Sequence, residues 1–239
     1  MNMIRGIIFD YGGTLDTNSQ HWSEVLWTAY QEELVPVSKE QFRECYVHAE
    51  RELAKHPYIQ PEHNFLDLLR IKADIETQYL VDKGYWPSLE VERRAIMEHI
   101  ALRCYCHVLD VLKVSREVVR QLAEKYPLVL VSNFYGNIHT ILRDFQLDYF
   151  TSVIESSVVG VRKPDPKIFQ LGVDALGMPA ADILVVGDSF SKDIVPAHSL
   201  GCQTVWMKGQ GWGNEEIDES LPSHILTDIA QLPKLLENS

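Results

Sequence analysis

The sequence lacks the features that mark several special classes of protein. Its 239 residues include four cysteines, which are too few and too irregularly spaced for a disulfide framework in a chain of this length. Cys104 and Cys106 lie beside His107, but no second pair of ligands with zinc spacing accompanies them, which favours reduced thiols over a metal site. No apolar run approaches the roughly 20 residues of a membrane span, and no signal-peptide pattern opens the sequence. We therefore expect a cytoplasmic protein.

Positive charge is also scarce. There are 22 Lys and Arg residues against 34 Asp and Glu residues, a formal net charge of −12. Because no cluster of basic residues offsets this balance, we expect neither nucleic acid nor an anionic membrane surface as a partner. The composition is 46% apolar and 10% aromatic, which is enough to bury a sizeable core.

The first half of the chain changes character once. An apolar run at residues 4–9 ends on Asp10 and two glycines, which predicts a buried parallel strand followed by a loop. Residues 18–110 instead carry apolar side chains at helical spacing. Proline or glycine breaks fall near residue 36, at 57–61 and at 84–87, so about four helices are expected there.

After residue 112, helical and strand patterns alternate, which is typical of parallel βαβ units. We expect strands at residues 128–131, 153–154, 183–186 and 204–207, and helices at 118–124, 138–145, 167–176, 194–200 and near 229–236. The predicted fold class is α/β, a doubly wound, Rossmann-like parallel sheet formed by residues 1–17 and 111–239. An all-helical cap, residues 18–110, is inserted after its first strand.

Three polar residues directly follow predicted strands. They are Asp10, Ser132 and Asp188. In an open parallel sheet, ligands bind at the carboxyl ends of the strands near the point where the winding reverses. We therefore expect these three side chains to meet in one crevice.

Four segments carry the strongest pattern. They are FDYGGTLD at residues 9–16, VSN at 131–133, RKPDP at 162–166 and GDSFSKD at 187–193. In their residues, order and placement they resemble the four motifs of the haloacid dehalogenase-like hydrolase superfamily. This resemblance implies an α/β core with a C1 cap between the first and second motifs, which agrees with the helical insertion expected above.

The residue types suit phosphoryl transfer. The carboxylate of Asp10 could attack phosphorus and form an aspartyl-phosphate, which splits a difficult hydrolysis into two steps. Asp10 and Asp188 could lie close together only with a cation between them, and hard oxygen ligands suit Mg²⁺. Lys163 would add a second positive charge on the same anion. Magnesium is therefore the expected cofactor, and a small phosphorylated metabolite is the expected partner.

The resemblance implies a role for each motif residue. Asp10 is the expected nucleophile, Lys163 a catalytic and phosphate-binding residue, and Asp188 a metal ligand. The Gly12 carbonyl, Asp193 and Asp10 itself are the other expected metal ligands. The other expected phosphate-binding residues are Thr14, Ser132 and Asn133.

Three of the motif positions also have simpler interpretations. Asn133 could shape the turn after its strand instead of binding substrate. Asp193 could cap the helix that follows Asp188. Asp16 matches an acidic position common in the family, but an Asp before a helix is also a natural N-cap, which we favour. The glycine-rich residues 209–213 lack the setting of a dinucleotide fingerprint and are expected to form a loop near the crevice rim.

Gly12 is a departure from the family pattern. The superfamily's phosphatases usually carry there a second Asp, which protonates the leaving alcohol and then activates water. Glycine cannot transfer a proton, so a water or a cap side chain would have to replace it. General acid–base help is worth about 10²–10⁴ in rate. The cap histidines that could supply it are His21, His48, His56 and His63.

Two alternatives to a phosphatase stay open. One is a carbon–phosphorus hydrolase resembling phosphonoacetaldehyde hydrolase, which needs a cap lysine for a Schiff base; the available lysines are Lys39, Lys55, Lys72 and Lys83. The other is a phosphate-binding or protein-interaction module without turnover. The dehalogenases proper also lack the second Asp, but they carry an aromatic residue there and use no magnesium, so the retained Asp188 and Asp193 disfavour them.

Overall fold

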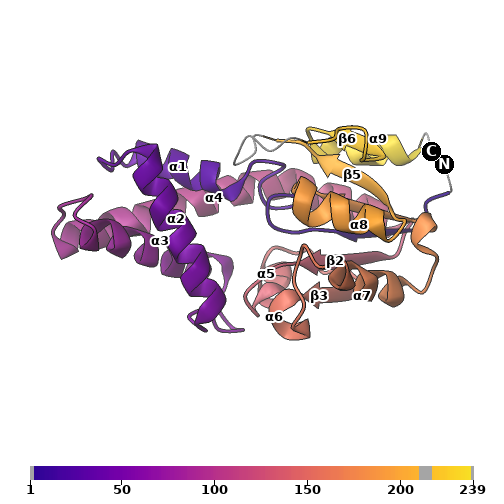
Figure 1. Ribbon diagram of the computed structural model, residues 1–239, viewed down its shortest axis with the longest axis horizontal. Coiled ribbons are helices and arrows are strands. Elements are labelled where there is room, and N and C mark those ends of the chain that lie inside the picture. Colours follow the sequence, from indigo (N-terminus) through magenta and orange to yellow (C-terminus); the bar gives the residue numbers. More distant parts are fainter. Residues whose placement is uncertain (1–2, 210–216, 238–239) are drawn as a thin grey trace.

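The computed structural model describes residues 3–209 and 217–237. It contains a six-stranded parallel sheet in the order β3-β2-β1-β4-β5-β6 (Figure 1). The strands are β1 (Gly6–Phe9), β2 (Leu128–Ser132), β3 (Ser152–Glu155), β4 (Ile183–Gly187), β5 (Gln203–Met207) and β6 (His224–Leu226). The predicted α/β class and parallel sheet are confirmed. Of the predicted glycine-rich loop, all but Gly209 lies outside the described residues.

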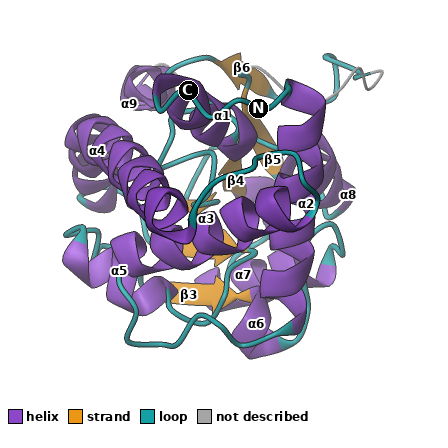
Figure 2. Cartoon of the chain, turned by 90° about the vertical axis from the view of Figure 1, so that its left-hand side faces the viewer, coloured by secondary structure: helices purple, strands orange, loops and turns teal. Residues whose placement is uncertain are grey.

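Helices cover both faces of this sheet (Figure 2). On one side lie α7 (Lys167–Leu176) and α8 (Val195–Ser199), and on the other lie α5 (Ile138–Asp144), α9 (Leu232–Glu237) and part of α4 (Glu90–Ala123). Side chains along β1 alternate between these two layers, because successive residues of a strand point to opposite faces. Ile7 and Phe9 pack in one core, and Ile8 packs in the other.

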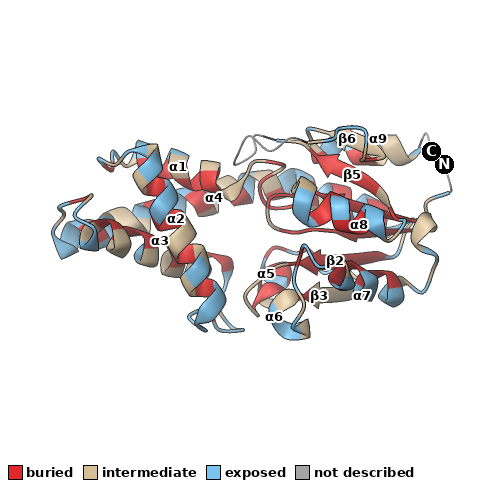
Figure 3. Cartoon of the chain, viewed as in Figure 1, coloured by how far each residue is buried: buried red, intermediate tan, exposed pale blue. Residues whose placement is uncertain are grey.

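The insertion after β1 is entirely helical, as predicted. It consists of α1 (Trp22–Glu32), α2 (Lys39–Lys55), α3 (Phe65–Asp82) and the first part of α4, which form a separate lobe beside the sheet (Figure 1). Capping boxes start α2 at Ser38 and Gln41, and α3 at Asn64 and Asp67, and these satisfy free backbone N–H groups. The buried sides of the helices face one another (Figure 3).

Helix α4 differs from the sequence-based expectation. It runs without interruption through 34 residues, whereas a new helix was expected at residues 118–124. No glycine or proline lies within it, so nothing in the backbone chemistry ends the helix inside this span. Its first part packs on α3, while Val118 and Leu122 are buried in the core of the sheet domain. Residue 110, the predicted cap boundary, lies inside this continuous helix.

Several short elements were not predicted, among them a helix and a strand. Helix α6 (Ser156–Val159) and strand β6 have four and three residues, which is too short for a hydrophobic period to stand out. Among residues 3–209 and 217–237, no helix combines the length and apolar character needed to cross a lipid bilayer.

Candidate functional site

A cavity of 850 Å³ lies at the carboxyl ends of the central strands, between the sheet and the helical insertion. Its walls include Asp10, Ser132 and Asp188, which follow or end β1, β2 and β4. The predicted convergence of these three residues is therefore seen in the structure. Of the other predicted site residues, Gly12, Asn133, Lys163 and Asp193 also line the cavity.

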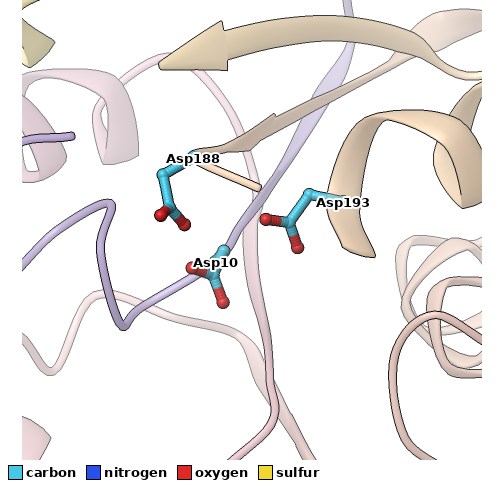
Figure 4. Close-up of side chains that lie close together, drawn as sticks. All are labelled: Asp10, Asp188 and Asp193. Atoms are coloured by element: carbon cyan, nitrogen blue, oxygen red, sulfur yellow. The ribbon is translucent and has the colours of Figure 1, made fainter. Parts of the chain in front are cut away.

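Three carboxylates gather at one point of the wall (Figure 4). Asp10, Asp188 and Asp193 each offer an oxygen atom within 4.8 Å of the others. The structure described here holds no other group of three or more His, Cys, Asp or Glu residues with this spacing. Oxygen ligands of this kind suit a hard divalent cation, so the three aspartates could hold a metal ion.

Asp193 is positioned by its own turn. It belongs to a single turn of π-helix, Phe190–Ile194, that follows β4. Its Oδ2 accepts a hydrogen bond from the Ser189 amide at 3.0 Å, while its Oδ1 lies 2.7 Å from the ammonium of Lys163. One oxygen thus organises the turn, and the other faces the charged cluster.

Lys163 is the cation in contact with this cluster. Its Nζ lies 2.5 Å from Asp10 Oδ1, and the lysine is only 4% exposed. Burial lowers the pKa of Lys163, but Asp10 and Asp193 outweigh that effect and raise it overall. The ammonium contacts Asp10 and Asp193 but not Asp188. One positive charge among three carboxylates leaves negative charge in the cluster, so an anionic ligand would be repelled unless a further cation bound there.

Burial and mutual repulsion also act on the carboxyl groups. Burial raises the pKa of Asp10 to about 6, with Lys163 opposing the shift and Asp193 adding to it. The pKa of Asp188 is raised well above its ordinary value by burial and by its two acidic neighbours. A bound divalent cation would favour the ionised forms of all three groups.

Two glycines allow the carboxylates to come this close. Gly13 has a φ of +95°, and a Cβ added there would lie 2.3 Å from Asp188 Oδ2. A Cβ at Gly187 would lie 2.5 Å from the Cβ of Asp193. Neither position has room for a side chain, whereas a Cβ at Gly12 would meet nothing closer than the Trp22 Nε1 at 4.0 Å.

The polar residues of the first two motifs are used in different ways. Thr14 is fully buried, and its hydroxyl donates a hydrogen bond to Asp10 Oδ2 at 3.1 Å. Ser132 is 2% exposed and lines the cavity. Asn133 accepts a hydrogen bond from the Lys163 amide at 2.8 Å and donates one to the Lys163 carbonyl at 3.1 Å. Its side chain therefore holds the backbone of Lys163.

The interpretation of Asp16 as a helix N-cap is wrong. Helix α1 begins at Trp22, and its N-cap is His21. Asp16 instead accepts hydrogen bonds from the Gly13 amide at 2.7 Å and from the Trp22 indole at 3.0 Å. Burial raises the pKa of Asp16 to about 7. Asp16 is fully buried, although it is one of the wall residues of the cavity. Its two hydrogen bonds hold the loop that carries Gly12.

The candidate cap histidines differ in whether they line the cavity. His21 and His56 line it, whereas His48 and His63 are not among its wall residues. The Nδ1 of His21 accepts a hydrogen bond from the Ser23 amide. Burial lowers the pKa of His21 to about 4, so at neutral pH its imidazole is uncharged and is a poor proton donor.

The cap lysines that could form a Schiff base also differ in whether they line the cavity. Lys55 and Lys72 line the cavity, whereas Lys39 and Lys83 do not. Lys72 pairs with Glu50. Burial lowers its pKa, but Glu50 outweighs that effect and holds the pKa well above its ordinary value. An amine held in its protonated form is a poor nucleophile for a carbonyl group.

Sequence reasoning missed several residues of the cavity wall. Glu50 and Tyr135 were not singled out, although they contact each other between the helical insertion and the sheet domain. No motif marks Glu50; its one signal is that it lies four residues after Tyr46 on α2 and so shares a helix face with it. The two cysteines of the predicted thiol pair differ in burial, since Cys104 is buried and Cys106 is exposed.

Comparison with known proteins identifies the class. The family model for haloacid dehalogenase-like hydrolases matches residues 4–201. This chain therefore belongs to the haloacid dehalogenase-like hydrolases, and the helical insertion between β1 and β2 is consistent with the C1 cap of that superfamily.

Individual relatives in the family carry out different reactions. The chain is 32% identical over 130 residues to the 5-amino-6-(5-phospho-D-ribitylamino)uracil phosphatase of Escherichia coli, a match that covers 53% of this chain and 52% of the relative. It is 26% identical over 137 residues to the (S)-2-haloacid dehalogenase of Pseudomonas putida, with 56% of this chain and 60% of the relative covered. The matches thus span about half the length of these curated relatives.

A solved structure matches over almost the whole chain. The magnesium-bound HAD-hydrolase YfnB of Bacillus subtilis aligns with a TM-score of 0.60 at 18% identity, covering 98% of this chain and 99% of that one. At this level of identity, the match supports the fold alone.

Proposed function

We propose that this protein is a magnesium-dependent phosphatase that acts on a small phosphorylated metabolite through a phosphorylated Asp10. The observation that carries the proposal is the cluster of Asp10, Asp188 and Asp193, in which Asp10 and Asp193 pair with the ammonium of Lys163. With a divalent cation bound, this cluster would attract a phosphate group. Magnesium would supply charge neutralisation and alignment of the phosphoryl oxygens.

In the proposed reaction, a carboxylate oxygen of Asp10 attacks phosphorus, and the bond from phosphorus to the ester oxygen breaks. The leaving oxygen takes a proton from water. A second water then attacks the phosphorylated Asp10, which releases inorganic phosphate and regenerates the carboxylate, and the water's proton passes to solvent. Each bond that forms is therefore matched by one that breaks.

The neighbouring residues have supporting roles in this proposal. Thr14 donates to Asp10 and directs its other oxygen toward the substrate. Ser132 and Lys163 bind phosphoryl oxygens, and Asn133 keeps Lys163 in place through its backbone. The Gly12 carbonyl, Asp188 and Asp193 complete the metal site. The helical insertion, for which we propose residues 18–110, forms the wall over the leaving group.

The alternatives are less well supported by the same contacts. Displacement of a halide from carbon by Asp10 needs no metal, so it gives no reason to place Asp188 and Asp193 beside the nucleophile. Lys72 is poorly suited to form a Schiff base, because the Glu50 carboxylate keeps the pKa of its amine high. A module without turnover does not require Lys163 to contact a buried Asp10, a contact that the structure retains.

Hydrolysis of p-nitrophenyl phosphate tests the proposal. We expect turnover with magnesium, none with EDTA, and a loss of at least about 10³-fold in Asp10→Asn, which removes the nucleophile. Asp148→Asn, an exposed aspartate, is the matched control and should retain activity. Chloride release from 2-chloropropionate should stay at background.

Two results would contradict the proposal. Turnover of the phosphate that survives in Asp10→Asn would remove Asp10 as the nucleophile. Chloride release that exceeds phosphate release and persists in EDTA would identify a dehalogenase instead.

A further inference from the structure

The cap side of the cavity holds an ion pair between a buried lysine and a partly exposed glutamate, which the proposed chemistry does not use. Lys72 of α3 pairs with Glu50 of α2, and its ammonium lies 4.4 Å from the centroid of the Tyr46 ring. A pair of this kind adds little stability, because the desolvation of the Lys72 ammonium offsets much of its attraction to Glu50. The same cavity wall also includes apolar residues, namely Leu53, Ile59, Phe65, Leu68 and Leu69.

The two partners differ in what they offer to a ligand. The side chain of Lys72 is 5% exposed, whereas that of Glu50 is 40% exposed and lines the cavity. The Tyr135 hydroxyl lies 3.4 Å from each carboxylate oxygen of Glu50. The ammonium is thus enclosed in the wall by Glu50 and Tyr46, while the carboxylate keeps a free surface toward the cavity.

Glu50 faces the cavity as an acceptor. Burial raises the pKa of Glu50, but the ammonium of Lys72 outweighs that effect and lowers it overall, and Lys192, which also lines the cavity, adds to the lowering. An ionised carboxylate has lone pairs for about four hydrogen bonds and no proton to donate. Lys72 and Tyr135 occupy part of this capacity, so a ligand group that comes against Glu50 must donate a hydrogen bond or carry positive charge.

Glu50 also lies in the same cavity as the proposed phosphoryl site. Tyr135, which contacts it, follows Ser132 by three residues in the loop after β2. The cavity volume of 850 Å³ falls in the range of pockets that enclose an organic ligand, so there is room for a leaving group in addition to the phosphoryl group.

We propose that Glu50, held in place by Lys72 and Tyr135, selects phosphate monoesters whose organic part presents hydrogen-bond donors such as hydroxyl groups, and rejects those with a second anionic group there. This proposal rests on the proposed phosphatase function. Glu50 is a specificity-determining residue, and Lys72 is a positioning residue that acts through it.

Two inhibitors of equal chain length test the proposal. Sorbitol 6-phosphate ends in a hydroxyl group where 6-phosphogluconate ends in a carboxylate, and each is measured as a competitor of p-nitrophenyl phosphate hydrolysis. Both compounds are phosphate esters of a primary alcohol, so the missing acid at Gly12 affects their two inhibition constants alike. We expect sorbitol 6-phosphate to bind at least about tenfold more tightly, because a carboxylate would face Glu50 without a donor.

Variants of α2 then assign the preference to Glu50. Glu50→Gln keeps the size of the side chain but removes its charge, so the two inhibition constants should come within about threefold of each other. Glu50→Asp should retain the preference for sorbitol 6-phosphate. Glu44→Gln removes a carboxylate from the same helix outside the cavity, where Glu44 contacts Tyr85, and should leave the ratio as in the wild type.

Each outcome bears on the inference. A tenfold preference that persists in Glu50→Gln would overturn it, and so would tighter binding of 6-phosphogluconate by the wild type, which would indicate that Lys72 or Lys192 receives an anion. If Glu50→Gln fails to fold, the wild-type ratio and that of Glu50→Asp decide. Absence of wild-type turnover of p-nitrophenyl phosphate would contradict the proposed function rather than this assignment.

Discussion

Restoring a carboxyl group at position 12 should enhance the reaction on poor leaving groups. Gly12 lines the cavity beside Asp10, and a Cβ there would have its nearest neighbour, the Trp22 Nε1, at 4.0 Å. The backbone at Gly12 does not adopt the left-handed conformation that Gly13 requires. The Cβ of Gly12→Asp is therefore accommodated without a clash, and the substitution places a proton donor in the loop that Asp16 holds.

The size of the gain follows from leaving-group chemistry. A positioned general acid is worth about 10²–10⁴ in rate, or roughly 3–5 kcal/mol of barrier, when an alkoxide must be protonated as it leaves. Part of that gain is offset because a new carboxylate adds to the negative charge of Asp10, Asp188 and Asp193. We therefore expect at least about a tenfold rise in kcat/KM for an alkyl phosphate, and a change within about threefold for p-nitrophenyl phosphate, whose phenolate leaves unaided.

The assay compares kcat/KM for glycerol phosphate and p-nitrophenyl phosphate in the wild type, in Gly12→Asp and in Gly12→Asn. Asn has the size of Asp but donates no proton at neutral pH, so it should leave the ratio between the two substrates unchanged. Equal effects of Asp and Asn would refute the reasoning. A gain of the same size on both substrates would also refute it, because protonation of the leaving group would then not limit the wild type.

Two further perturbations test the packing and the electrostatics of the structure. Gly13→Ala should abolish the stabilisation of the protein by magnesium in thermal melts, because its Cβ would displace the Asp188 carboxylate. The control is Gly84→Ala, at a glycine with a φ of +70° and no neighbour within 4 Å of an added Cβ, which should keep that stabilisation. Equal responses of the two variants to magnesium would count against the metal site. Burial raises the pKa of Glu76 to about 7 from 4.5, so its ionisation opposes folding as pH rises from the unfolded value through the folded one. Between pH 5 and pH 8, the free energy of unfolding should therefore fall by about 2–3 kcal/mol more in the wild type than in Glu76→Gln. Urea titration at each pH measures this free energy. Parallel pH profiles of the two proteins would show that Glu76 does not cause the loss of stability.

Much of the fold was predictable because its signals are local. The apolar runs that became β1, β2, β4 and β5 are each followed by polar or turn residues, and the breaks near Pro36, Pro57 and Gly84 end the cap helices where expected. Parallel pairing then brings Asp10 and Asp188 together, because β1 and β4 are neighbours in the sheet. The position of the site thus follows from topology.

The contacts that depend on packing were not predictable. Asp16 looked like a helix cap because a helical pattern follows it, but the loop returns its carboxyl group to Gly13 and Trp22. Glu50 meets Tyr135 across 85 positions of the sequence, and no local pattern signals such a pair. The continuity of α4 was missed because a change in apolar rhythm near residue 112 reflects a change of packing partner and not an end of the helix.

The central claim is that Asp10 carries the phosphoryl group, and rapid acid quenching with peptide mass spectrometry tests it most directly. Enzyme mixed with acetyl phosphate and magnesium should yield a peptide heavier by one phosphoryl group, with the modification on Asp10, and EDTA should suppress it. A phosphoryl group on another residue, or full turnover of the phosphate with no modified Asp10 at any quench time, would contradict the account.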